Sequence, residues 1–370
     1  MGAELTIILP TRNRPRLCET QVRFLQRACI RHRVIVADSS DGVNDDLRAA
    51  CTGMIAYHRF APSVSLESKM ATAAQSVATP YVAMITDDDI AFPHAIEACT
   101  EFLQQNPGYV AAQGYVLDCS IGESCIDIHG VRWSVPGVVE ATPLKRLARL
   151  MQRYQPNFWA VFRSGAYHRA LARSRAAKGA IFKELAFAST LAMLGHTARL
   201  PLVHTLRGDE ESHTPPAEAH PFLWFLKDTR SFFSCYVGYR QLLLDLHGEW
   251  DVDDLADALP LRDDAALSHA IDFIHASYWG REVDTGRINH IADILADDAS
   301  RLDHAIASFS IQSPRDRTIR EGDRAAPPST TGRQCIWRAS VLNAQPRSEI
   351  AIDDAEVARV SAALEDYGRQ

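Results

Sequence analysis

The first two hundred residues alternate short apolar runs with segments of helical periodicity. The apolar runs are rich in β-branched residues and end at turn formers, a pattern typical of buried strands. They cover residues 5–9, 33–37, 54–60, 81–85, 109–117, 126–133, 157–162 and 197–206. The segments with a one-sided apolar face cover residues 17–28, 65–77, 91–105, 143–153 and 179–194. This alternation predicts an α/β domain, in which helices flank a sheet.

The pattern changes after residue 214, where Pro215 and Pro216 interrupt the chain. The remainder has mainly helical periodicity, and residues 315–332 are charged and rich in proline and threonine, as is typical of a flexible stretch. We therefore expect two parts, an α/β domain over residues 1–214 and a mainly helical region over residues 215–370. Aromatic residues of the second part fit a core or a homo-oligomer interface. The expected helices cover residues 221–247, 263–277, 287–310 and 353–367.

The composition is that of a folded protein, with 46% hydrophobic residues and a net charge of −7 over 370 residues. Without a basic excess, we expect no nucleic-acid partner. The eight cysteines form no C-x-x-C pair, which favours reduced thiols. No leader or long apolar span is recognisable. The expected location is the cytoplasm, without a transmembrane segment, while contact with a membrane surface stays open.

Three adjacent carboxylates, those of Asp87, Asp88 and Asp89, follow the strand predicted at residues 81–85. Open α/β sheets bind ligands beyond the carboxyl ends of their strands. Adjacent carboxylates repel each other unless a cation or basic side chains compensate their charge. Mg²⁺ and Mn²⁺ prefer such oxygen ligands and often bridge to substrate phosphates. The alternative is that these acids cap the helix predicted at residues 91–105.

Polar residues also end the first two predicted strands. Thr11 follows the first, with Arg12 and Arg14 offering guanidinium donors to a base or a phosphate. Asp38 ends the second and can accept a hydrogen bond from a nucleobase. The alternatives are solvated loop charges and, for Asp38, a turn in which the carboxylate binds its own backbone.

The order of these elements resembles family 2-like glycosyltransferases of the GT-A fold over about residues 4–213. The segments that carry the resemblance are residues 9–15, 36–42 and 81–89. The resemblance implies a mixed, mostly parallel sheet flanked by helices. It also implies inverting transfer of a sugar from a nucleotide-diphosphate donor, preferably a UDP-sugar, to a hydroxyl acceptor in glycan or polysaccharide synthesis. Neither a dinucleotide-binding glycine motif nor a P-loop follows the first strand.

The resemblance assigns roles to residues along this edge of the sheet. Asp88 and Asp89 would bind a divalent cation, Mn²⁺ or Mg²⁺, with His204 or His213 as a further ligand or diphosphate contact. Lys69 stands near a position where the family contacts the nucleotide; without the resemblance, the interpretation is a surface lysine. The full set implied to bind the nucleotide sugar is Thr11, Arg12, Arg14, Asp38, Lys69, Asp87 and Arg207.

Glu184 stands where the family places its catalytic base, in a helix that ends at Gly195. Lys183 occupies the position of an expected acid, and we expect its charge to lower the pKa of Glu184. We also expect Gly195 to take the left-handed conformation of a helix C-terminus. The alternative for Glu184 is an acid of the first helical turn. Trp159 and Trp133 are candidates for stacking on an acceptor sugar, or for the core.

Two other functions remain compatible with this pattern. A sugar-phosphate nucleotidyltransferase uses a related sheet, but normally has a glycine-rich basic loop where residues 10–15 lack glycine. A non-catalytic member could act as a binding or assembly module through the helical region. Pyrophosphate release and nucleotide-sugar hydrolysis distinguish these functions from sugar transfer.

Overall fold

The computed structural model describes residues 4–28, 31–121, 126–208, 224, 228–248, 266–272, 274–275 and 350–367. The predicted helix at residues 287–310, the predicted flexible stretch at residues 315–332 and His213 lie outside the described residues.

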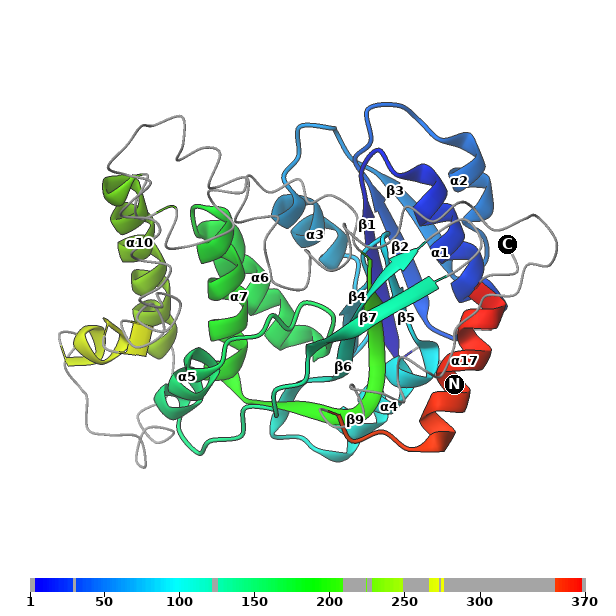
Figure 1. Cartoon of the computed structure of the whole chain (residues 1–370). Helices are drawn as coiled ribbons and strands as arrows, with labels where there is room; N and C mark the ends of the chain where they lie inside the picture. Colours follow the sequence, from blue (N-terminus) through cyan, green and yellow to red (C-terminus); the bar gives the residue numbers. More distant parts are fainter. Residues whose placement is uncertain are drawn as a thin grey trace, which may run out of the picture.

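A nine-stranded sheet forms the centre of the described structure (Figure 1). Its order is β3-β2-β1-β4-β8-β6-β9-β5, and β7 pairs with β6. Strands β1, β2, β3, β4, β6 and β9 share one direction, and β5, β7 and β8 oppose it. The predicted mixed, mostly parallel sheet is therefore confirmed. The strands are β1 (Leu5–Thr11), β2 (Arg33–Asp38), β3 (Ile55–Arg59), β4 (Tyr81–Met84), β5 (Asp89–Ala91), β6 (Tyr109–Ile121), β7 (Ile126–Trp133), β8 (Val161–Arg163) and β9 (His196–Arg207).

Helices cover both faces of this sheet. Alternate residues of a strand point to opposite faces. On one face Ile7 and Val34 pack among α1, α2 and α4, and on the other Ile8 and Ile35 pack among α3, α6 and α7. The helices are α1 (Pro15–Arg27), α2 (Asp45–Ala50), α3 (Leu66–Ala74), α4 (Pro93–Gln105), α5 (Pro143–Gln152), α6 (Ser164–Ala176), α7 (Ala180–Leu194), α10 (Thr229–Gly248) and α17 (Asp354–Tyr367).

The predicted helix at residues 91–105 begins later than expected. Asp89–Ala91 form the short strand β5, which pairs antiparallel with β9. Helix α4 starts at Pro93 after Phe92, with no side-chain cap and no acid in its first turn. The alternative that the three aspartates cap this helix is therefore wrong.

The expected left-handed Gly195 is also wrong. Its φ of −178° is extended backbone. A Cβ atom at this position would lie 2.5 Å from Val110 Cγ1 and 3.2 Å from the Gly108 carbonyl oxygen. Glycine is needed here because α7 passes into β9 in close contact with the neighbouring strand β6.

Two helices from beyond residue 214 pack against opposite sides of the α/β part (Figure 1). Helix α10 buries Tyr239 and Leu243 in one core with α7. Helix α17 buries Val360 and Leu364 in another core, together with residues of α1 and β9. None of the described helices has both the length and the apolar character needed to cross a membrane.

Candidate active site

The carboxyl ends of β1, β2 and β4 bring the first predicted residues together. Thr11 and Asp38 are paired in register at the ends of β1 and β2. The Thr11 hydroxyl donates a 2.6 Å hydrogen bond to Asp87 Oδ2, in the loop that follows β4. Three residues predicted to bind one ligand therefore share one edge of the sheet.

Asp38 is fully buried and already bound within the protein. Its Oδ1 accepts hydrogen bonds from the Ser40 amide at 2.7 Å and the Ser40 hydroxyl at 2.6 Å. The Tyr57 hydroxyl donates to Oδ2 at 2.6 Å. The carboxylate thus organises the turn after β2, as in the alternative considered from the sequence. Contact with a nucleobase stays a prediction.

Lys69, on α3, is buried rather than a surface lysine. Its ammonium group donates to the Thr11 carbonyl oxygen at 2.8 Å and to Ser39 Oγ at 2.9 Å. Burial lowers the pKa of Lys69 to about 8, while the nearby carboxylates of Asp87 and Asp38 oppose that shift. Lys69 therefore links α3 to the ends of β1 and β2.

The three aspartates have different environments. Asp89 is 3% exposed and accepts hydrogen bonds from the Thr86 hydroxyl, the Trp159 indole N–H and the Gly208 amide. Burial raises the pKa of Asp89 to about 6, and Asp88 adds to that shift. Burial likewise raises the pKa of Asp87 to about 6, against the hydrogen bond from Thr11. Of the three, Asp89 is the most completely bound by protein groups.

Asp88 is the most accessible aspartate, with a side chain that is 20% exposed. Arg14 Nη1 lies 2.7 Å from Asp88 Oδ2 and 3.5 Å from Asp87 Oδ1. A basic side chain therefore compensates the clustered negative charge, one of the two solutions expected from the sequence. Arg12, two residues earlier, is exposed. Nowhere in the described part of the chain do three metal-ligating residues converge.

Glu184 lies in the second turn of α7, because that helix begins at Ala180. The alternative of a first-turn acid is therefore wrong. The Tyr154 hydroxyl donates to Glu184 Oε1 at 2.8 Å. Burial raises the pKa of Glu184, whereas Tyr154 and Arg207 act against this shift.

The expected effect of Lys183 on Glu184 is wrong as well. Lys183 Nζ lies 3.1 Å from Glu67 Oε2, on α3. Successive residues of a helix point in different directions, so neighbours in sequence need not face each other. The pKa of Glu184 is raised by its surroundings, not lowered by Lys183.

Arg207 and His204 lie on β9 in different settings. Arg207 is paired in register with Asp89, and its Nη1 lies 3.7 Å from Asp118 Oδ1. His204 is 1% exposed, and its Nδ1 lies 3.0 Å from Thr205 Oγ1. Burial lowers the pKa of His204 to about 3. Since its carbonyl oxygen accepts from the Phe92 amide, His204 lies beyond β5, deeper in the sheet than the aspartates.

The two predicted aromatic residues lie against each other. The ring centroids of Trp133 and Trp159 are 4.6 Å apart, and the rings are inclined by 38°. Trp133 is buried, and the indole N–H of Trp159 is bound to Asp89. The pair therefore borders the acid cluster, and its contact with an acceptor stays a prediction.

Two tyrosines of this site were not predicted from the sequence. Tyr57 binds Asp38, and Tyr154 binds Glu184, across separations of 19 and 30 residues. Neither tyrosine stands in a recognisable motif, because its role depends on how distant segments pack. Only the tertiary structure reveals them.

The chain matches no protein-family model and no curated protein sequence. It is similar to the solved structure of S. aureus TarS 1–349, with a TM-score of 0.43 and 14% identity over 78% of this chain and 74% of that one. For the same protein in complex with UDP-GlcNAc, the TM-score is 0.44 and the identity 12% over 76% of this chain and 73% of that one.

Glucosyl-3-phosphoglycerate synthase from Mycobacterium tuberculosis, in complex with Mn²⁺, UDP and glucosyl-3-phosphoglycerate, is similar with a TM-score of 0.36 and 14% identity. The similarity covers 68% of this chain and 82% of that one. All three TM-scores are below 0.5.

Proposed function

We propose that this protein is an inverting glycosyltransferase, which moves a sugar from a nucleotide-diphosphate donor to a hydroxyl acceptor. The observation that carries the proposal is two kinds of carboxylate near Arg207, which is paired in register with Asp89 and whose charge acts on Glu184. Asp88 is accessible and lies beside the Arg14 guanidinium, whereas Glu184 is partly buried and has a raised pKa. The first suits a diphosphate, whose charge must be compensated, and the second suits a base.

The donor would bind across the ends of β1, β2 and β4. The nucleobase of the donor would lie near Thr11 and Asp38, and its diphosphate near Arg14 and Arg207. UDP is the nucleotide that the motif resemblance implies. Guanidinium groups pair well with phosphate oxygens, and Arg207 is partly exposed. The buried Lys69 would hold the Thr11 backbone in place for this contact.

A divalent cation would bind at this edge beside Asp88 and Asp87. The Arg14 guanidinium shows that a positive group is accommodated there, 2.7 Å from Asp88. Mg²⁺ is often held by one or two carboxylates together with substrate phosphates, so three converging protein ligands are not required. When bound, the cation would neutralise charge on the leaving diphosphate. Asp89 is bound by three protein donors and His204 is buried, so we propose neither of them as a ligand.

Glu184 would remove the proton from the acceptor hydroxyl. Its pKa is raised toward neutral pH, and a general base is most effective when its pKa lies near the pH of the reaction. Tyr154 would position Glu184 through the 2.8 Å hydrogen bond. The positive charge of Arg207 would keep Glu184 ionised before the reaction. Trp159 and Trp133 would border the acceptor.

The test is the Glu184→Gln variant, assayed for UDP release from a panel of UDP-sugars in the presence of hydroxyl acceptors and Mn²⁺. We expect at least a roughly hundredfold loss of kcat, as for removal of a general base. UDP binding, measured by thermal shift, should be unchanged. Glu101→Gln, which changes an exposed acid on α4, is the matched control.

Full transfer activity in the Glu184→Gln variant would show that Glu184 is not the catalytic base. Pyrophosphate release from a nucleoside triphosphate and a sugar phosphate, without UDP-sugar turnover, would instead establish a nucleotidyltransferase. Binding detected by thermal shift without any turnover would indicate that the protein is a non-catalytic binding module.

A further inference from the structure

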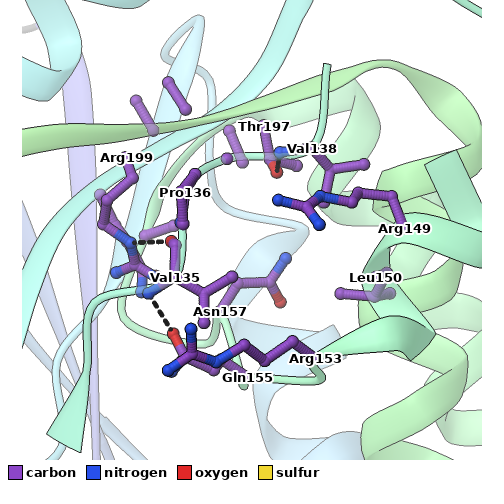
Figure 2. Close-up of a pocket in the computed structure, with 16 residues that line it drawn as sticks. Val135, Pro136, Val138, Arg149, Leu150, Arg153, Gln155, Asn157, Thr197 and Arg199 are labelled. Atoms are coloured by element: carbon purple, nitrogen blue, oxygen red, sulfur yellow. Dashed lines mark hydrogen bonds between the residues drawn. The ribbon is translucent and has the colours of Figure 1, made fainter. Parts of the chain in front are cut away.

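A hollow lies between α5, the first residues of β6 and β9, and residues 135–138 (Figure 2). Counted together with adjoining solvent, its empty space is about 500 Å³. Three arginines line it: Arg149 and Arg153 at the end of α5, and Arg199 on β9. No acidic residue is among its lining residues.

Arg199 places a positive charge in the interior. Its guanidinium donates to the carbonyl oxygens of Val135 and Gly114. Within the described part of the chain, no carboxylate forms an ion pair with it. Burial lowers the pKa of Arg199 only to about 10, so the side chain stays charged at neutral pH. A buried cation that has only neutral partners favours an anion nearby.

The other two arginines add to this positive charge. Arg149 Nε lies 3.6 Å from Glu140 Oε1, and its Nη1 donates to Gln152. For Arg153, no ion pair forms with any residue that the structure describes. Three guanidinium groups therefore face the hollow against one neighbouring carboxylate.

Asn157 shows that a ligand here needs a donor as well as negative charge. Its Oδ1 is buried, and no donor reaches it from the described residues. Figure 2 shows the Asn157 side chain directed into the hollow, with Arg149 above it and Arg153 below it. A buried carbonyl oxygen without a donor carries a desolvation penalty, which a ligand hydroxyl would offset.

We propose that this hollow binds a small oxyanion that also carries a hydroxyl group. The arginines would hold the charged group, and Asn157 Oδ1 would accept from the hydroxyl. Guanidinium groups bind phosphoryl and carboxylate oxygens alike, so the class comprises small phosphates and hydroxycarboxylates. None of the residues that line the hollow is among those proposed for the transfer reaction, and this proposal does not depend on that reaction.

The test is binding to the full chain, measured by calorimetry with two matched pairs of probes in the absence of nucleotide. Phosphate is compared with sulfate, and glycolate with acetate, because the second member of each pair lacks a hydroxyl at neutral pH. We expect the hydroxyl-bearing member of at least one pair to bind about tenfold more tightly. A preference within the first pair identifies a phosphoryl ligand, and one within the second identifies a carboxylate.

Two variants locate the binding in the hollow. Arg153→Ala should weaken binding roughly tenfold, whereas Arg175→Ala, an exposed arginine of α6 outside the hollow, should not. Asn157→Leu should abolish the preference for the hydroxyl and retain the folded structure. Absence of saturable binding, equal binding within both pairs, or equal effects of Arg153→Ala and Arg175→Ala would overturn the proposal.

Discussion

The acid-rich sheet edge and the arginine-lined hollow are opposite in charge and differ in how far the protein satisfies its own groups. At the edge, Asp89 has three internal donors and Asp88 has the Arg14 guanidinium. In the hollow, Arg199 has only neutral partners, and Asn157 Oδ1 has no donor among the described residues. Only the edge was prominent in the sequence, because its three acids are adjacent.

The difference shows that clusters of like charges fall into two kinds: those that the protein compensates itself and those that it leaves without opposite partners. Charges that the protein compensates contribute to stability, and a ligand must then displace an internal partner. Buried charges that the protein leaves without an opposite partner lower stability and attract a ligand directly. Substitutions at the edge should therefore change stability, whereas substitution of the exposed Arg153 in the hollow should change binding alone.

The largest effect is expected at Asp89. Asp89→Ala leaves the donors of Thr86, Trp159 and Gly208 without an acceptor, at an expected cost of about 2–4 kcal/mol in the free energy of unfolding. Urea unfolding measures this loss. Asp88→Ala, one residue away and more exposed, should cost less than about 1 kcal/mol. Equal losses in the two variants would show that Asp89 is not the structural carboxylate.

A smaller effect is expected at Arg14. Arg14→Ala leaves Asp87 and Asp88 without their nearest positive charge, which should cost about 1 kcal/mol at low salt and less at high salt. Mn²⁺ should raise the melting temperature of this variant more than that of the wild type, because a cation would replace the guanidinium. Arg12→Ala, at an exposed neighbouring arginine, is the control. A salt-independent loss would contradict charge compensation.

His204, which lies between the two regions on β9, should produce a pH effect. Its pKa of about 3 in the folded protein is below the ordinary value of 6.5 because of burial and the nearby charge of Arg199. The unfolded chain therefore binds a proton that the folded protein excludes, so stability falls as the pH decreases from about 6.5 toward 3. The melting temperature of His204→Leu should fall less over this range. Parallel curves for variant and wild type would contradict the buried neutral histidine.

The smallest effect on stability is expected in the hollow. Arg153 is exposed and lacks an ion-pair partner within the described structure, so Arg153→Ala should change the free energy of unfolding by no more than about 0.5 kcal/mol. Urea unfolding of this variant beside Asp89→Ala tests the comparison directly. A loss of several kcal/mol would mean that the arginines of the hollow are structural.

The sequence was sufficient where local patterns determine structure. The apolar runs that became β1, β2 and β4 end at polar turns, and parallel strands bring their carboxyl ends to one edge. The meeting of Thr11, Asp38 and Asp87 could therefore be predicted. Helix α3 begins after Ser65, whose side chain accepts from the Ser68 amide, as its sequence indicates.

The sequence was insufficient where distant segments decide the outcome. The three residues of β5 form a strand only because β9 lies beside them. The pKa of Glu184 depends on burial and on Tyr154, not on the adjacent Lys183. The arginine-lined hollow is assembled from separate segments, between residues 111 and 199, none of which has a distinctive local pattern.

Glu356, one of the acids of α17, binds a backbone amide of β9 although it lies more than 150 residues further along the chain. Its Oε1 accepts a 2.9 Å hydrogen bond from the Val203 amide, where the pairing of β6 and β9 is irregular, and lies 3.0 Å from His94 Nε2. A shortened protein that stops before residue 350 would expose this amide and the apolar surface beneath Val360 and Leu364. Recombinant work should therefore retain α17, since its removal would favour self-association through uncovered β-structure.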